Sequence, residues 1–434
     1  MGLGLVQYWL VKIIPENRWR PSENKIYSDC MSTLQRLAFM TAFGASFLTP
    51  RGNGQTFTTI YRFQGPPDGE TPQDIVAGAN GVLYGTTQYG GAFGFGTVFE
   101  LQGPFGSGTA AETVLYSFTG GDDGGYPIAN PVVGANGALY GTAYGGTAGY
   151  GVVFELLPPD QPGGTWTETV LYNFTGGDDQ NPEGSLVIGA HGELFGVTNG
   201  NGYQDYWGEV FELQPPSQPG GAWTETVLYG FNSNILAIGE IPNSLTIGPG
   251  GVLYGTTRVG AEIHGTVYEV RPPAAGSEAW TASPIYTFTA ADGGSAAAPT
   301  MGPDGIVYGT TSFGGSGGWG TVFQLTPPSA PGGTWTKTVL YNFNNTGDGG
   351  TPWAPLVLYN GSLYGTAGVV FELQKPAAPG DSWTEIVLHT FPTIHGVDYN
   401  PSGNIVVAAG GTVYGTIWNG PGPKGSGTVF KIEP

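Results

Sequence analysis

Cysteine, basic residues and long apolar runs are scarce in this sequence, and each scarcity excludes a class of protein. Cys30 is the only cysteine among 434 residues, so a disulfide framework and a cysteine-based metal cluster are both excluded. No run of about 18 apolar residues occurs, so no membrane-spanning helix is predicted. Neither an HExxH motif nor a P-loop is present, so these signatures of catalysis are missing as well.

Basic residues are outnumbered by acidic ones, 13 against 33, and the formal net charge is −20. Of these, 30 acidic residues but only seven basic ones lie beyond Arg51. An acidic surface repels phosphate backbones and anionic lipid surfaces. We therefore expect neither a nucleic acid partner nor insertion into a membrane.

Glycine, proline and aromatic residues are abundant. The 78 Gly and 35 Pro together exceed a quarter of the chain, a share that without hydrophobic residues would indicate disorder. Aromatic residues make up 13% of the sequence, which argues against disorder, because disordered chains contain few of them. Short runs of Val, Thr, Tyr and Phe between glycines predict many short strands and an all-β fold.

One stretch of sequence recurs along the chain. LYGTTQYGGAFGFGTVFEL at 83–101 returns as LYGTAYGGTAGYGVVFEL at 139–156 and in five further versions. Periods of about 50 residues are typical of propellers, solenoids or arrays. The aromatic residue of the LYGT element marks seven repeats at Tyr84, Tyr140, Phe195, Tyr254, Tyr308, Tyr364 and Tyr414.

Each repeat contains four strand-like runs, here called a, b, c and d, and strands a and b are joined by hairpin dipeptides such as Asn80-Gly81. The repeat region begins with a lone d-like run, TFTTIYRF at 56–63, and ends with a, b and c runs that lack a d. These fragments complement each other, and joining them would remove an exposed sheet edge. The sequence therefore predicts a seven-bladed β-propeller over 56–434, with four antiparallel strands per blade and the last blade closed by the N-terminal strand.

The first 55 residues differ in kind and are predicted to be a leader. From Met31, MSTLQRLAFMTAFGASFLTP has a basic residue, a short apolar stretch and a Gly44-Ala45-Ser46 site of small residues, as in a signal peptide. We expect translation to start at Met31 and the protein to be extracellular or in the cell envelope. A disordered tail over 1–55 is the alternative.

The pattern P..L..G.(D/N)G.LYGTT..GG..G.GTVF.L, followed by VLY.F and DG..P, resembles the tandem repeats of the choice-of-anchor GloVer-containing bacterial proteins. The resemblance covers about 57–434 and recurs seven times. It implies export and attachment through a C-terminal anchor, but the chain ends in GTVFKIEP without such an anchor. The family has no established activity, so the resemblance implies no chemistry. The double glycine after strand b is also similar to kelch repeats.

In a propeller the d–a and b–c loops share one face, which we call the mouth face. Its d–a loops are rich in Asp and Gly, as in TGGDDGGYP at 119–127, and its b–c loops carry aromatic residues. Sugars stack on rings and donate hydrogen bonds to carboxylates, so this face is predicted to bind carbohydrate. The candidate ligand-binding residues are Asp122, Asp123, Asp178, Asp179, Asp205, Tyr206, Trp207, Trp319 and Trp418.

Two repeats depart from the pattern on this face. Blade three has the unusual loop NGNGYQDYWGE at 199–209, and blade six reads LYGTAGVVFEL at 363–373, so its b–c loop is nearly deleted. Departures from a repeat are where a specific site is expected. The deletion predicts a notch in the rim.

Structural roles are the alternative for these residues. Asp-Gly pairs are ordinary turn formers, and loop aromatics also pack between blades. The tryptophans that open the d strands, such as Trp166, recur regularly and are predicted to pack blades together. Calcium could bind the Asp122/Asp123 and Asp178/Asp179 loops, but the ligand ladder of an EF-hand is missing, so we expect no cofactor.

These observations together predict a secreted, monomeric binding propeller without catalytic or metal-binding residues. Its expected ligand is a polysaccharide on the mouth face, or a cell-surface or extracellular protein. The alternative is a carbohydrate-active enzyme, a glycoside hydrolase or lyase, with its site at the axial mouth, because carboxylates from two blades could meet there. A purely structural surface protein is the third possibility.

Overall fold

The computed structural model describes residues 54–434 apart from 104, 106–109, 162, 201–206, 219, 232–237, 260–263, 278, 331, 379, 392, 395–396, 399–400, 402 and 420–424. The predicted leader, with Cys30 and Met31, lies outside these residues except for its last two positions. Asp205 and Tyr206 of the candidate site lie outside them as well.

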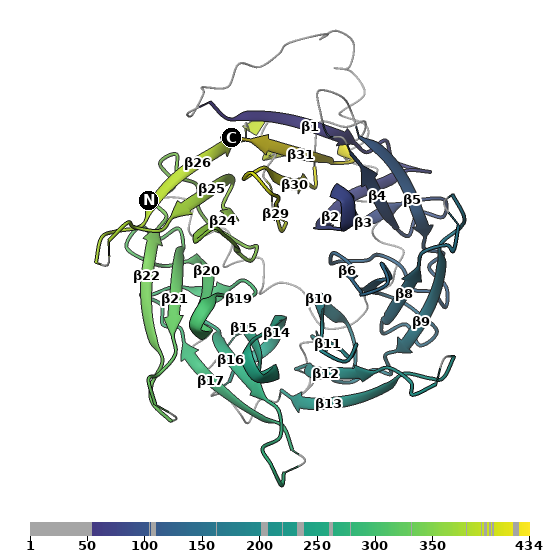
Figure 1. Cartoon of the computed structure of the whole chain (residues 1–434), viewed down its shortest axis with the longest axis horizontal. Helices are drawn as coiled ribbons and strands as arrows, with labels where there is room; N and C mark the ends of the chain where they lie inside the picture. Colours follow the sequence, from purple (N-terminus) through teal and green to yellow (C-terminus); the bar gives the residue numbers. More distant parts are fainter. Residues whose placement is uncertain are drawn as a thin grey trace, which may run out of the picture. The chain divides into compact units, whose positions relative to one another are not determined.

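Seven antiparallel sheets are arranged in a ring, and the predicted seven-bladed β-propeller is confirmed. Figure 1 shows the a strands around the axis and the d strands on the circumference. Blade 1 consists of β2 (Gly69–Ala77), β3 (Leu83–Gly90), β4 (Thr97–Gln102) and β5 (Ala111–Ser117). Blade 2 consists of β6 (Val132–Val133), β7 (Leu139–Ala143), β8 (Val152–Leu157) and β9 (Thr167–Asn173).

The next three blades follow the same order. Blade 3 consists of β10 (Pro182–Ile188), β11 (Leu194–Thr198), β12 (Glu209–Gln214) and β13 (Thr224–Gly230). Blade 4 consists of β14 (Glu240–Ile247), β15 (Leu253–Val259), β16 (Thr266–Arg271) and β17 (Thr281–Thr287). In blade 5 the a strand is split into β18 (Gly294–Ala296) and β19 (Thr300–Met301), followed by β20 (Val307–Phe313), β21 (Thr321–Thr326) and β22 (Thr336–Asn342).

The last two blades complete the ring. Blade 6 consists of β23 (Val357–Tyr359), β24 (Ser362–Thr366), β25 (Val369–Gln374) and β26 (Thr384–Thr390), and a small hairpin of β27 (Thr393–Ile394) and β28 (Val397–Asp398) follows it. Blade 7 consists of β29 (Val406–Val407), β30 (Val413–Ile417), β31 (Thr428–Glu433) and β1 (Thr56–Arg62).

The predicted closure by the N-terminal strand is confirmed, because β1 pairs with β31 from Thr56↔Glu433 to Arg62↔Thr428. Side chains reinforce this joint. The Phe57 ring stacks on His389 of β26 with centroids 4.0 Å apart, and Thr416 Oγ1 donates a hydrogen bond to the Gln73 carbonyl at 2.6 Å. The chain ends are therefore tied to both neighbouring blades, and the ring has no free sheet edge at this point.

The a–b hairpins follow the predicted turn chemistry. Three of them contain the 3-10 turns η1 (Ala79–Gly81), η2 (Pro249–Gly251) and η3 (Pro303–Gly305). Asn80 and Gly81 both have positive φ, 56° and 77°, as a type I′ hairpin requires. At Asn136-Gly137 only the glycine has positive φ, and the Gly137 N–H donates to the Gly134 carbonyl, so this turn has another geometry within the same length.

A glycine under an aromatic ring is the repeated packing unit within each blade. The glycine of the LYGT element faces the aromatic residue of strand c in the same sheet. A Cβ added to Gly309 would lie 2.5 Å from Cζ of Phe323, and the other six glycines have equally close contacts. The room above this glycine is thus filled by the ring of its own blade.

The same ring also joins neighbouring blades. Phe118, at the end of the d strand of blade 1, meets Phe154 of blade 2 edge-on with centroids 5.2 Å apart. Edge-to-face and tilted aromatic contacts of this kind are favourable beyond the area they bury. The equivalent pairs, with centroids 5.1 to 5.5 Å apart, are Phe63–Phe99, Phe118–Phe154, Phe174–Phe211, Phe231–Tyr268, Phe288–Phe323, Phe343–Phe371 and Phe391–Phe430.

The regular tryptophans pack between blades, as predicted. Trp166, just before β9, lies edge-on against Tyr84 of β3, with centroids 6.1 Å apart. Trp223, Trp280, Trp335 and Trp383 make the same contact with the preceding blade. These five indoles are therefore structural.

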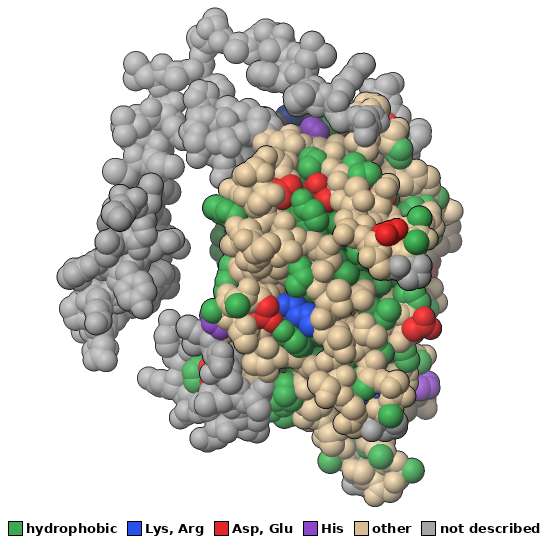
Figure 2. Space-filling model, turned by 90° about the vertical axis from the view of Figure 1, so that its left-hand side faces the viewer, with side chains coloured by type: hydrophobic (Ala, Val, Ile, Leu, Met, Phe, Trp, Pro, Cys, Tyr) green, Lys and Arg blue, Asp and Glu red, His purple; other side chains and the backbone are tan. Residues whose placement is uncertain are grey.

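Acidic side chains on the outer wall are dispersed. Figure 2 views one side of the molecule, where they stand singly or in twos, and one of them lies beside a basic side chain. On this side the negative charge is therefore spread and not gathered in one patch.

No helix in the described part of the chain is both long and apolar enough to cross a membrane.

Replacing Gly309 by Ala is expected to lower the free energy of unfolding by about 1–3 kcal/mol, because the new methyl group overlaps the Phe323 ring. Gly230→Ala is the matched control, since a Cβ there meets nothing within 4 Å. Denaturant unfolding of the two variants measures the difference. Equal stability of both variants would contradict the packing role of the glycine.

Candidate functional site

A cavity of about 990 Å³ lies where the a strands of all seven blades converge at the mouth face. Its wall is formed by residues in or just before the a strands and by residues near the ends of the b strands, such as Gln73 of β2 and Arg258 of β15. A volume of this size fits a small ligand or part of a polymer. The predicted axial mouth is therefore an open cavity.

An ion pair between two blades provides the charge in this cavity. Arg258 of β15 is hydrogen-bonded to Glu183 of β10, and both residues line the cavity. Asn199 Nδ2 donates to Glu183 Oε2 at 2.9 Å, and Arg258 also contacts Asn243 Oδ1 at 3.5 Å. The Arg258 side chain keeps 44% of its surface exposed. An oriented guanidinium with free donors therefore faces the ligand space.

Asp74 of β2 adds a carboxyl group set deep in the fold, with part of its surface open to the cavity. Burial raises its pKa to about 6, although the Asn404 N–H, which donates to Oδ1 at 2.7 Å, opposes the shift. Gly403 makes this approach possible, because a Cβ there would lie 2.1 Å from the same oxygen. Near pH 6 the Asp74 side chain can therefore donate or accept a proton.

Aromatic side chains complete the wall. Trp353 and Trp418 line the cavity and are 62% and 41% exposed. Tyr144 lies beside the ion pair, and burial together with Glu183 raises its pKa to about 12, against the opposing charge of Arg258. Its hydroxyl therefore stays protonated and can donate a hydrogen bond at neutral pH.

Of the predicted residues, only Trp418 lines this cavity among those that the structure describes. Trp319 lines a second hollow of about 460 Å³ at blade six, where the nearly deleted b–c loop predicted a notch. Trp353 lines both hollows. The notch is therefore present and borders on the axial cavity.

Asp123 and Asp179 have their carboxylates engaged in the d–a turns. Asp123 Oδ2 accepts hydrogen bonds from the Tyr116 hydroxyl at 2.9 Å and the Thr119 N–H at 2.8 Å. Asp179 is bonded in the same way to Tyr172 and Thr175. This geometry favours the turn-forming alternative for both residues.

The neighbouring aspartates differ from each other. Asp122 is exposed and accepts one hydrogen bond, from Thr147 Oγ1 at 3.2 Å. Asp178 Oδ1 accepts the Trp207 N–H at 2.7 Å and so ties blade 2 to blade 3. The Trp207 ring is partly buried against the core between blades 3 and 4, where it has a packing role.

Sequence reasoning missed Asp74, Glu183, Arg258 and Trp353. Each of them occupies a position where the residue varies from blade to blade, and its unusual residue type there was the signal that could have found it. Arg258, for example, stands where blades 1 and 5 have Gln88 and Ser312. The four residues lie in or beside the inner strands near the axis, whereas the residues predicted from the sequence come from the longer loops.

A buried pair of carboxyl groups recurs where blades meet. Next to Asp123 lies Glu168 of β9, and burial with the charge of Asp123 raises the pKa of Glu168 to about 7. Glu209 occupies a position where other repeats have Thr or Val. Its burial, together with the charge of Asp179 above all, raises its pKa to about 8. Glu112, Glu225 and Glu385 have pKa values raised to about 7 beside Asp68, Asp179 and Asp348.

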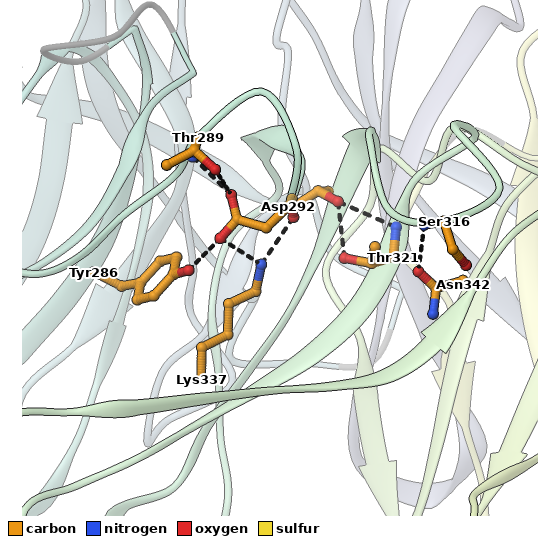
Figure 3. A network of polar contacts seen from close by, with 8 residues as sticks. Tyr286, Thr289, Asp292, Ser316, Thr321, Lys337 and Asn342 are labelled. Atoms are coloured by element: carbon orange, nitrogen blue, oxygen red, sulfur yellow. Dashed lines mark hydrogen bonds and ion pairs between the residues drawn. The ribbon is translucent and has the colours of Figure 1, made fainter.

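At the joint between blades 4 and 5, Lys337 stands where other joints have a glutamate. Figure 3 shows Asp292 accepting hydrogen bonds from Tyr286 and Thr289 while Lys337 of β22 approaches from the next blade. Lys337 Nζ lies 3.2 Å from Asp292 Oδ2 and donates to the Asp292 carbonyl at 2.8 Å. At this joint the Lys337 ammonium group therefore compensates the charge of Asp292. At the other joints described above, the equivalent aspartate lies beside a glutamate.

No three acidic, histidine or cysteine side chains among the described residues are arranged to hold a metal ion. Since Asp123 and Asp179 are also engaged in their turns, the described part of the chain gives no support to a calcium site there.

Seven blades around an axial cavity lined by indoles and an ion pair define a β-propeller with a ligand-sized mouth. The chain belongs to the Gloeobacter/Verrucomicrobia repeat family, whose model matches residues 41–268 and 241–434. The suspected GloVer resemblance is thereby confirmed. No curated protein matches the chain.

Two solved structures are similar to the chain at low sequence identity. The extracellular domain of the putative one component system BT4673 from B. thetaiotaomicron is 11% identical with a TM-score of 0.54, over 88% of this chain and 42% of that one. A putative 6-phosphogluconolactonase from Bacteroides uniformis is 17% identical with a TM-score of 0.48, over 73% of this chain and 85% of that one. These likenesses concern the fold alone.

Asp123→Ala is expected to destabilise the protein by about 1.5–3 kcal/mol, because it removes a charged acceptor of several hydrogen bonds. Asp122→Ala is the control and should change stability by less than about 0.5 kcal/mol, since Asp122 is exposed. Thermal unfolding distinguishes the two. A stable Asp123→Ala variant with a ligand-binding defect would restore the binding role predicted for Asp123.

The carboxyl pairs predict that stability falls as the pH rises from about 4.5 to about 7. In this window the folded chain binds more protons than the unfolded chain, because the pKa values of Glu112, Glu168, Glu225 and Glu385 rise from 4.5 to about 7 on folding. The melting temperature should therefore be higher at pH 5.5 than at pH 8. Glu168→Gln should flatten this dependence, and Asp160→Asn, at an exposed loop position, should not.

Proposed function

We propose that this protein is an exported, non-enzymatic binding propeller that holds a carbohydrate in the axial cavity. The observation that carries the proposal is the combination, in one cavity of about 990 Å³, of two exposed indoles with an ion pair. Trp353 and Trp418 offer apolar faces on which the C–H faces of sugar rings stack. Glu183 and Arg258 offer an acceptor and donors for hydroxyl groups.

The charge of the chain is consistent with a neutral partner. At −20 the protein repels polyanions, and the cavity pairs its one guanidinium with a carboxylate. A neutral glycan loses little hydration energy on entering such a site, because its hydroxyl groups exchange water for protein hydrogen bonds.

Export and a monomeric state are part of the proposal. The signal-like stretch from Met31 supports export, and the fold is shared with a domain described as extracellular. A surface polysaccharide is the partner that fits the cavity, and an extracellular protein docking on the mouth face is the alternative.

Trp418→Ala is expected to weaken retention on the bound polysaccharide by about tenfold or more, because an aromatic anchor that a ligand covers contributes much of the binding energy. Phe93→Ala is the matched control, because Phe93 is 59% exposed and lies outside the residues that line the cavity. The full chain is incubated with a panel of soluble neutral and acidic polysaccharides, and retention and new reducing ends are scored together. No retention on any polysaccharide would refute carbohydrate binding.

A carbohydrate-active enzyme is the second candidate, and Asp74 is the observation that favours it. A carboxyl group with its pKa near 6 in the same cavity as Glu183 has the protonation needed of a general acid. New reducing ends in the same panel would select the enzyme. In that case Asp74→Asn would abolish cleavage, and the activity of the unchanged chain would decline as the pH rises through 6.

A further inference from the structure

Blade six lacks the cover that the b–c loop gives elsewhere on the mouth face. Strands β24 and β25 are joined by Ala367 and Gly368 alone, with the Ala367 N–H donating to the Val369 carbonyl at 2.9 Å. In blade two the same connection runs from Tyr144 to Gly151. The short connection leaves a hollow of about 460 Å³, the blade-six notch, bordered by Trp319, Trp353, Gly350 and Ala367.

Two indoles form the walls of the notch. Trp319, from the b–c loop of blade five, is 44% exposed, and Trp353, which precedes β23, is 62% exposed. Most other tryptophans of the propeller pack between blades. Two large apolar side chains that border one hollow and stay exposed are therefore available to a ligand.

The backbone fixes the Trp319 wall and the floor of the notch. The Thr351 N–H donates to the Trp319 carbonyl at 2.7 Å, and the Gly350 N–H donates to the Ala367 carbonyl at 2.8 Å. A Cβ at Gly350 would lie 3.0 Å from Cβ of Trp319, so the floor passes directly beneath the indole. Because these backbone segments are already held in place, they lose little conformational entropy when a ligand binds, and this favours affinity.

The lining chemistry points to a neutral ligand with hydroxyl groups. None of the described residues that line the notch carries a charge, and the polar ones include Asn345, Thr351 and Thr390. Indoles combined with amide and hydroxyl groups suit a sugar ring better than a lipid, which has no use for the polar groups, or a charged polymer, which would find no counter-charge.

Trp353 belongs to the walls of both the notch and the axial cavity, so the two hollows adjoin at this side chain. We propose that the blade-six notch is a second sugar subsite, and that the protein binds a linear neutral glycan chain with one part in the axial cavity and the next in the notch. This inference rests on the proposed function and adds that the ligand is a chain, which leaves the cavity through the gap in blade six.

The test restores the missing loop. Inserting the blade-two sequence Tyr144–Tyr150 between Ala367 and Gly368, with Ala in the place of Tyr144, restores the length of the repeat and is designed to fill the notch. The tyrosine is left out because Tyr144 lines the axial cavity in blade two. Trp319→Ala removes one wall only, and Phe93→Ala is the control for an exposed aromatic residue elsewhere. Thermal unfolding confirms that each variant is folded. The probes are β-1,4-linked gluco- and manno-oligosaccharides of two and six units, with dissociation constants measured by calorimetry.

The unchanged chain should bind one six-unit probe about tenfold or more tighter than its two-unit counterpart. The loop insertion and Trp319→Ala should abolish this gain with length while leaving the affinity for the two-unit probe unchanged. A length gain that survives the insertion would overturn the notch subsite and leave the axial site intact. Binding of neither probe would instead count against the proposed function, and binding of a proline-rich peptide that is lost in Trp319→Ala would assign the notch to a peptide.

Discussion

The packing of one aromatic ring on one glycine is the contact on which this propeller depends. In each blade the ring of strand c, such as Phe323, fits over a glycine of strand b, such as Gly309, where any Cβ would clash. The same ring receives the edge of a phenylalanine from the preceding blade, with centroids 5.1 to 5.5 Å apart at the seven joints. Cohesion within a blade and cohesion between blades therefore share one side chain, which explains why the repeat tolerates little change at these positions.

Because the periodic residues complete the packing, residues that break the period are free for other roles. Glu183, Arg258 and Trp353 have no counterparts around the ring, and all three lie at the axis. The deleted loop of blade six is likewise a departure from the repeat that exposes Trp319. The binding surface that we propose thus consists of residues that differ from their counterparts in the other repeats. Such residues can change without loss of the fold.

The acidity of the chain has a structural side. Several glutamates face an aspartate across a blade joint, and their raised pKa values show that burial and like charge favour the protonated form. The joint with Lys337 solves the same problem with an ion pair. Charge within the ring is therefore accommodated either by a proton or by a counter-ion, and the first solution works better in a mildly acidic medium than in an alkaline one.

The sequence by itself determined the number of blades, their strand order and the closure of the ring by β1, because each repeat carries its own turn and packing signals and the terminal fragments complement each other. It also indicated the notch of blade six and the packing role of the regular tryptophans. Only the tertiary structure decided which residues share the axial cavity. Asp74 and Arg258 stand 184 positions apart in the chain and line the same cavity because the ring brings the inner strands of the blades together. The tertiary structure likewise decided that Asp123 and Asp179 are engaged in turns. The sequence could not show this, because an aspartate that stabilises a turn and one that binds a ligand are the same residue type in the same kind of loop.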